Sequence, residues 1–173
     1  TYNCKNIEIR DSFFDQAKNY GSGSYGANLQ LASDCLVENN IFYSVSSPLM
    51  LAQGSSGNVL AYNFMTNGIY YTYTNAWMPP SINPHYVHSC MNLFEGNYGS
   101  GVAFDFTHGS SSHQTVFRNL LTGWDGRPTQ TANTLPINLM DTNYCINIVG
   151  NLLGTRGYQT NYQISVDAPM NNN

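Results

Sequence analysis

Six segments of the chain repeat one apolar pattern around a fixed polar residue, and this repeat most constrains the fold. The polar residue is serine in the first copy and asparagine in the other five, and we count positions from it. Position −3 is always apolar, and position +1 is always apolar or aromatic. The six polar residues are Ser12, Asn40, Asn63, Asn97, Asn119 and Asn151, at intervals of 28, 23, 34, 22 and 32 residues.

This spacing is typical of a solenoid with a base period near 22 to 23 residues and with loops inserted into some coils. A tight bend between two short strands needs a residue that accepts a left-handed backbone and bonds to the main chain, and asparagine does both. Stacked amides can hydrogen-bond one another in a ladder, while the flanking apolar side chains point into the coil. The repeat therefore predicts an all-β chain: a right-handed parallel β-helix of about six coils with two long loop insertions.

Composition and spacing argue against other folds. Charged residues make up only 9% of the chain, against roughly 25% in ordinary globular domains. Uncharged polar residues, glycine and tyrosine fill the deficit, which suits short strands and turns. A leucine-rich repeat would have a similar asparagine ladder, but its L-x-x-L-x-L spacing is missing. A β-sandwich has short strands and many turns, yet it does not require the same residue at one phase six times.

Several segments also carry a family resemblance. They are 95–97 (Glu-Gly-Asn), 105–109 (Asp-Phe-Thr-His-Gly), 117–119 (Phe-Arg-Asn) and 150–158 (Gly-Asn-Leu-Leu-Gly-Thr-Arg-Gly-Tyr). Over almost its whole length the chain resembles the pectate-lyase-like superfamily of right-handed parallel β-helix proteins, bacterial members in particular. The resemblance implies the fold. It does not imply one activity, because the superfamily contains lyases, hydrolases, esterases, tailspikes, adhesins and inert coils.

Charge and hydropathy exclude two classes of partner. The net charge is −4 and the six Lys and Arg residues form no cluster, so the basic patch that binds nucleic acid is missing. No apolar run approaches the roughly 18 residues of a membrane-spanning helix. An uncharged polar surface is common outside cells, and we expect an extracellular or cell-surface location.

The four cysteines, Cys4, Cys35, Cys90 and Cys145, contain no C-x-x-C pair, which argues against a zinc knuckle. Two alternatives remain for them: small buried apolar side chains, or one or two disulfides.

The two long intervals predict loops at roughly 68–91 and 122–141. Aromatic rings stack on the apolar C–H faces of sugars, whose hydroxyls bond to polar side chains. Loops of neighbouring coils lie side by side, so both could wall one groove; alternatively, their aromatic side chains only seal the side of the coil. The candidate substrate-binding residues are Tyr71, Tyr73, Trp77, His85, His88, His113 and Trp124.

The densest reactive group is Asp105-x-x-His108-x-x-x-x-His113. General acid–base chemistry needs a carboxylate or an imidazole held near the reacting atom. Asp105 and His108 are close enough in sequence to share a turn and orient each other. In a purely structural role, Asp105 would make a turn hydrogen bond and His108 would fill a polar corner. The candidate catalytic residues are Asp105, His108, Glu95 and Arg127, the last for the charge of a substrate.

Signatures of known β-helix enzymes are missing. Neither the clustered Asp residues of calcium-dependent lyases nor the Asp-Asp and Gly-x-His pairs of polygalacturonase-type hydrolases occur. A glycosidase needs two carboxylates at a defined separation. Glu95, Asp125 and Asp141 are the candidate partners for Asp105.

A metal site would need the Asp105 and His108 side chains together with His85 or His88. No compact ligand motif such as HExxH is present. We therefore predict no resident metal and no other cofactor.

Two functions remain. The first is a carbohydrate-active lyase or glycoside hydrolase acting on a polysaccharide laid along the coil. The second is a non-catalytic structural, adhesin or filament module. The first predicts that Asp105, His108 and the loop aromatics converge on one solvent-open groove. The second predicts that they are dispersed or buried with satisfied partners.

Residues 1–173 predict a single β-helix domain with open ends. A β-helix exposes strand edges at each end, and natural ones cover them with a cap. Neither 1–5 nor 171–173 resembles an amphipathic cap. We expect further coils of a longer chain, another domain or a neighbouring subunit on at least one end, which includes end-to-end or side-by-side self-association.

Overall fold

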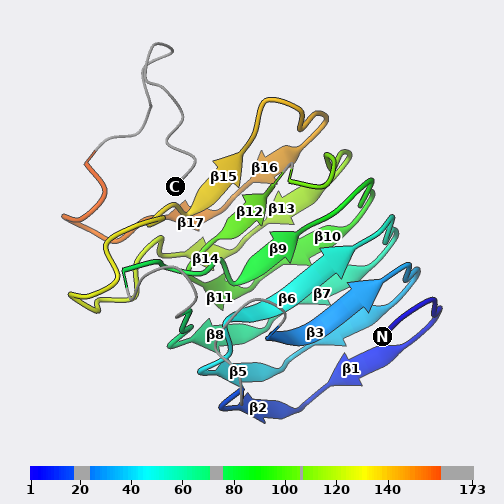
Figure 1. Cartoon of the computed structure of the whole chain (residues 1–173), viewed down its shortest axis with the longest axis horizontal. Helices are drawn as coiled ribbons and strands as arrows, with labels where there is room; N and C mark the ends of the chain where they lie inside the picture. Colours follow the sequence, from blue (N-terminus) through cyan, green and yellow to red (C-terminus); the bar gives the residue numbers. More distant parts are fainter. Residues whose placement is uncertain (18–23, 71–75, 106, 161–173) are drawn as a thin grey trace.

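Three parallel sheets wind into a right-handed β-helix of about six coils in the computed structural model (Figure 1). The structure describes residues 1–17, 24–70, 76–105 and 107–160, and no helix occurs within these ranges. Each of the first five coils contributes one strand to each sheet, and the last contributes one to each of two sheets within the described residues, so neighbouring strands come from successive coils. The predicted all-β fold is confirmed.

Each sheet is named here in the order in which the chain enters it. Sheet I contains β1 (Glu8–Arg10), β4 (Leu36–Glu38), β7 (Val59–Ala61), β10 (Leu93–Glu95), β13 (Thr115–Phe117) and β16 (Asn147–Val149). Sheet II contains β2 (Phe13–Asp15), β5 (Ile41–Tyr43), β8 (Phe64–Thr66), β11 (Tyr98–Gly99), β14 (Leu120–Leu121) and β17 (Leu152–Leu153). Sheet III contains β3 (Tyr25–Gln30), β6 (Ser47–Ala52), β9 (Ile82–Pro84), β12 (Val102–Phe104) and β15 (Ile137–Leu139).

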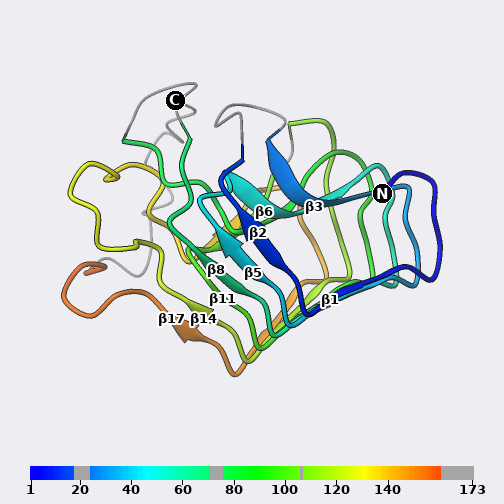
Figure 2. The ribbon, with the colours of Figure 1, turned by 90° about the horizontal axis from the view of Figure 1, so that it is seen from below.

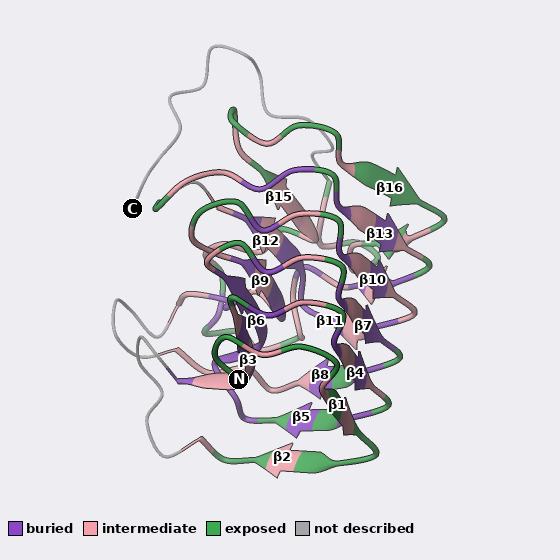
Figure 3. Cartoon of the chain, turned by 90° about the vertical axis from the view of Figure 1, so that its right-hand side faces the viewer, coloured by how far each residue is buried: buried purple, intermediate pink, exposed green. Residues whose placement is uncertain are grey.

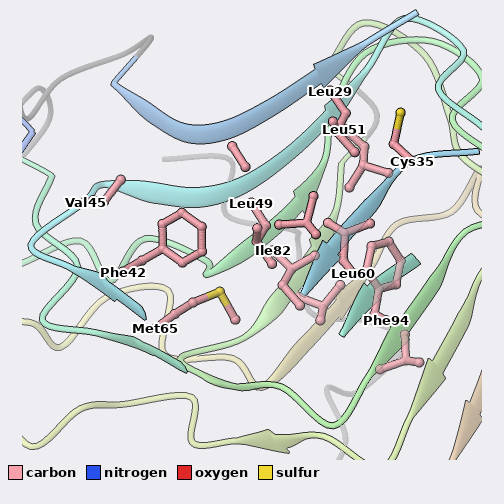
Figure 4. Packing of buried hydrophobic residues seen from close by; sticks show 14 of the residues in the cluster. Leu29, Cys35, Phe42, Val45, Leu49, Leu51, Leu60, Met65, Ile82 and Phe94 are labelled. Atoms are coloured by element: carbon pink, nitrogen blue, oxygen red, sulfur yellow. The ribbon is translucent and has the colours of Figure 1, made fainter. Parts of the chain in front are cut away.

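The core is the interior of the coil, filled by one inward row from each sheet (Figure 4). Position −3 of the repeat supplies the row of sheet I, where Leu60 and Phe94 are fully buried. Sheet III contributes Leu49 and Ile82, which pair with each other across β6 and β9. Because successive side chains of a strand point to opposite faces, the residues between these rows point to the outer face of the coil, where those of β6 are still buried.

The predicted asparagine ladder runs along the corner between sheets I and II. Asn63 Nδ2 donates to Asn97 Oδ1 at 3.0 Å, and Asn97 Nδ2 donates to Asn119 Oδ1 at 3.0 Å. The prediction that the asparagine itself takes the left-handed backbone is wrong. The preceding residue takes it, as at Tyr62 (φ 55°) and Gly96 (φ 64°). The asparagine side chain thereby turns inward, where it bonds to main-chain groups that the bend would leave unpaired.

A second amide ladder runs along the corner between sheets III and I. Asn58 Nδ2 donates to Asn92 Oδ1 at 2.9 Å, and Asn92 Nδ2 donates to Gln114 Oε1 at 3.1 Å. These three residues stand five positions before the asparagine of their own repeat. The pattern was missed because the first two coils and the last have Ile7, Cys35 and Ile146 at this position.

Both long insertions leave the coil at the corner between sheets II and III. They are the connections 67–81, between β8 and β9, and 122–136, between β14 and β15. The coil between them turns this corner with only Ser100 and Gly101, so the two insertions meet over it. Met78 N donates to Ala132 O at 2.9 Å, and Ala132 N donates to Ala76 O at 2.9 Å. Figure 2 shows the yellow loop of 122–136 projecting outward from the stack.

The first and last coils are more exposed than the middle of the stack (Figure 3). Phe13 on β2 is 63% exposed and Leu152 on β17 is 66% exposed. Within the described ranges, β1 and β2 at one end and β16 and β17 at the other pair with a strand on one side alone. What covers these edges stays a prediction.

Among the described residues, no helix has the length and apolar character to cross a membrane.

All four cysteines are free thiols, of which Cys35 is buried and Cys145 is exposed.

Candidate functional site

A groove of about 410 Å³ lies on the outer face of sheet III. Its floor is the outward row that alternates with the buried row: Met50 on β6, Asn83 on β9, Ala103 on β12 and Asn138 on β15. Tyr25 on β3 lines it at one end. The groove therefore crosses five strands along the coil axis, which at about 4.8 Å per strand gives roughly 19 Å.

One wall comes from chain segments that lead into the sheet III strands. It contains Tyr70, Trp77 and Pro79 of the first insertion and Asn133 of the second. Asn133 Nδ2 donates to Met78 O at 2.8 Å, which ties the two insertions together. The predicted meeting of two loops at one groove is thus observed, although only part of each loop reaches it. Tyr71 and Tyr73 lie outside the described residues.

The opposite wall is formed where the strands of sheet III end, and it carries the titratable side chains. His85 follows β9, whereas Asp105 and His108 follow β12. Ile82 and Val102 are paired across β9 and β12, so the residues three positions later, His85 and Asp105, meet between adjacent coils. Their parallel register brings together two residues that are 20 positions apart.

His85 Nδ1 is hydrogen-bonded to Asp105 Oδ2, and both side chains are less than one-fifth exposed. A carboxylate only accepts, so Nδ1 carries the proton and Nε2 of a neutral imidazole is left as an acceptor. The sequence expectation paired Asp105 with His108, whereas the structure pairs Asp105 with His85. An oriented imidazole backed by a carboxylate is suited to accept a proton from a bound substrate or water.

Two further groups hold the Asp105 carboxylate. Thr107 N donates to Oδ1 at 3.2 Å. The Asn83 amide is oriented so that its nitrogen, and not its oxygen, faces two acceptor oxygens. In this orientation Nδ2 donates to Ala103 O at 2.9 Å and to Asp105 Oδ2 at 3.3 Å. Asp105 is therefore a fixed acceptor for the imidazole.

Stacked rings fix the position of His108. His108 lies flat against Tyr86, with ring centroids 4.4 Å apart, and meets His85 edge-on at 5.0 Å. Tyr86 also packs edge-on against His85 at 4.4 Å. Because His108 is exposed at the rim while His85 is more buried, His85 is the better-oriented imidazole.

Several candidates lie away from the groove lining. Glu95 is on sheet I, where it accepts from Tyr62 Oη at 3.2 Å, and this bond raises the pKa of the Tyr62 phenol. His88 is exposed, with its backbone N bonded to Ser110 O. His113 bonds to Ser112 Oγ through Nδ1 at 3.0 Å.

The two candidate residues of the second insertion, Arg127 and Trp124, make contacts that stabilise the insertions themselves. Arg127 is paired with Asp125, and its Nη2 also donates to Gly68 O in the first insertion. Trp124 stacks on Tyr158 at 4.1 Å and donates from Nε1 to Arg127 O at 2.9 Å. Neither Arg127 nor Trp124 lines the groove.

A metal site was the other possibility for the histidine and carboxylate side chains. In the part of the chain that the structure describes, no three His, Cys, Asp or Glu side chains are gathered closely enough to hold an ion.

Sequence reasoning missed Asn83 and Asn138 as parts of the site. The signal for the floor was the alternation in Ile82-Asn83-Pro84 and Ile137-Asn138-Leu139, which places a polar side chain between two inward ones.

No protein-family model, curated protein or solved structure matches this chain. The groove itself is thus the basis for assigning a function.

Proposed function

We propose that the chain binds a polysaccharide along the sheet III groove and processes it, with His85 as the proton acceptor and Asp105 as the residue that orients it. The bond between His85 Nδ1 and Asp105 Oδ2 inside a groove lined by Trp77 carries the proposal. The resemblance to the pectate-lyase-like superfamily supports it, and such a protein would act outside the cell or at its surface.

The position of the candidates favours this function over a non-catalytic rod. Asp105, His108 and Trp77 converge on one open groove, as expected for an enzyme, and His85 joins them. A structural module has no need to gather two imidazoles, a carboxylate and a tryptophan around one groove. The groove also runs along the coil axis, which suits a long linear chain.

In the proposed step, Asp105 holds the imidazole through Nδ1 and stabilises the imidazolium that forms when Nε2 takes a proton. In hydrolysis, the proton comes from the water molecule that attacks the anomeric carbon as the glycosidic C–O bond breaks, and solvent protonates the departing oxygen. In an elimination, it comes from a sugar carbon next to a carbonyl group. The C–H electron pair then forms the new double bond, and the glycosidic oxygen on the neighbouring ring carbon leaves and takes a proton from solvent. Asp105 is the one carboxylate among the described groove-lining residues. The two-carboxylate arrangement of a glycosidase is therefore not assembled there, and His85 replaces the second carboxylate as base.

The test is a depolymerisation assay on a panel of polysaccharides, following new reducing ends and the absorbance of unsaturated products together. Reducing ends alone indicate hydrolysis, and both signals together indicate a lyase. We expect His85→Gln to abolish the signal, whereas His113→Gln, at an exposed histidine outside the groove, should retain it. Equal activity of His85→Gln and the unchanged protein would refute the role of His85.

A further inference from the structure

The charge distribution of the groove identifies a class of substrate. Among the described groove-lining residues there is no Lys and no Arg, and Asp105 is the one acidic side chain. The remaining lining consists of the imidazoles of His85 and His108 and of hydroxyl, amide, thioether, aromatic and aliphatic side chains.

Three of the five described Lys and Arg side chains are paired or packed at other sites. Arg127, the nearest in sequence to the groove wall, is paired with Asp125 and bonded to Gly68 O. Lys5 pairs with Asp34 at 3.1 Å. Arg118 lies over the Phe117 ring at 4.7 Å, next to sheet I. Because no described Lys or Arg lines the groove, no such cation stands beside Asp105 to pair with an anionic sugar.

We infer that the groove takes an uncharged polysaccharide and discriminates against polyuronates; this inference rests on the proposed function. A uronate carboxylate beside Asp105 would bring two like charges together with no Lys or Arg beside them, and neutral imidazoles at His85 and His108 would not compensate the repulsion, which disfavours binding. Neutral sugars meet no such penalty. Their hydroxyls can bond to Asn138, Asn133 and Thr107, and their C–H faces can stack on Trp77.

The test is a pair of galacturonan probes with one backbone, one fully methyl-esterified and one fully acidic, together with neutral glucomannan and galactan. Affinity electrophoresis and calorimetry measure binding to the unchanged protein. We expect at least one neutral probe to bind at least tenfold more tightly than acidic galacturonan. Tighter binding of the acidic probe, weakened by added salt, would overturn the inference and leave polysaccharide binding standing. Failure of all four probes to bind would overturn the proposed function, and the inference with it.

Two charge variants sharpen the test. Asp105→Asn removes the negative charge at nearly constant shape, and we expect it to reduce the preference for the neutral probes. Asn138→Lys puts a cation on the groove floor and should raise affinity for acidic galacturonan at least threefold. Its matched control is Asn147→Lys, on the exposed outer face of β16 in sheet I, which should change nothing. An Asn138→Lys protein that melts normally yet gains no affinity for the acidic probe would contradict the placement of the substrate over β15.

Discussion

His85 and Asp105 occupy equivalent positions in two successive coils, and Nδ1 of the imidazole is hydrogen-bonded to Oδ2 of the carboxylate. Each residue stands three positions after a member of the paired Ile82 and Val102 of sheet III. The contact therefore depends on the register of stacked coils, and the two side chains form one unit.

The first prediction concerns this unit. Asp105→Asn should lower the turnover rate about 100-fold or more, because an amide holds the imidazole less well and does not stabilise its charged form. The turnover rate of the double variant Asp105→Asn, His85→Gln should be little lower than that of either single variant. When two residues act as one unit, removing one already removes most of the contribution of both. Initial rates of reducing-end formation measure both effects. Losses that simply multiply would mean that the two residues act independently.

The two tryptophans provide a matched pair for the binding surface. Trp77 lines the groove, whereas Trp124 stacks on Tyr158 outside it. We expect Trp77→Ala to weaken polysaccharide binding about tenfold through loss of stacking. Trp124→Ala should leave the affinity unchanged while lowering the melting temperature, because Nε1 holds Arg127 O. Calorimetry and thermal unfolding separate the two outcomes, and equal loss of affinity in both variants would contradict the placement of the substrate.

Much of the fold was predictable because the corner chemistry repeats locally. The asparagine at position zero recurs in five coils with apolar neighbours, and its ladder was identified correctly. The residue with the left-handed backbone was not, because Tyr62 and Arg118 hold positive φ without being residues that favour it. Where the coil stack imposes a conformation, local preference is a weak guide.

The site was predicted only in part, for a related reason. The sequence places Asp105 near His108 along the chain, but the partner of Asp105 comes from the preceding coil. Finding His85 required the register of β9 with β12, and the 67–81 insertion hides that register in the sequence. Trp124 and Arg127 looked equivalent to groove residues because an inserted loop gives no sign of which side chains turn back on the loop itself.

The thiols give a test of the cysteine state. Under denaturing conditions we expect four reactive thiols, because all four cysteines are free in the structure. In the folded protein, exposed Cys145 should be alkylated first and Cys35 last. Burial raises the pKa of the Cys35 thiol, so little thiolate forms at neutral pH, and the side chain is also shielded from reagent. Mass spectrometry after timed alkylation gives the order; two or no thiols in denaturant would instead indicate disulfides.

The corner residue before β7 or β10 allows a reciprocal test of backbone strain. Gly57 (φ 68°) and Met91 (φ 55°) hold the same corner position in adjacent coils. Gly57→Ala should destabilise the protein by about 1–2 kcal/mol, because the left-handed backbone is strained and the new Cβ would lie 3.0 Å from Asp34 Oδ1. Met91→Gly, at a 67% exposed side chain, should stabilise by roughly 0.5 kcal/mol after the entropy cost of glycine. Urea unfolding measures the free energy of unfolding of both variants. Changes of the same sign would contradict the proposal that a left-handed backbone is strained at this corner.

The amide ladder should make the largest contribution per side chain outside the apolar core. Asn97 is 1% exposed; its Nδ2 donates to Leu60 O at 2.8 Å and to Asn119 Oδ1 at 3.0 Å, and its Oδ1 accepts from Asn63 N and Nδ2. Asn97→Ala leaves these buried groups without partners, and we expect a loss of about 2–4 kcal/mol in the free energy of unfolding. Asn147→Ala, on the exposed outer face of β16, should stay within about 0.5 kcal/mol. Urea unfolding at constant m-value gives both numbers, and similar losses would mean that the ladder adds nothing beyond the strands it joins.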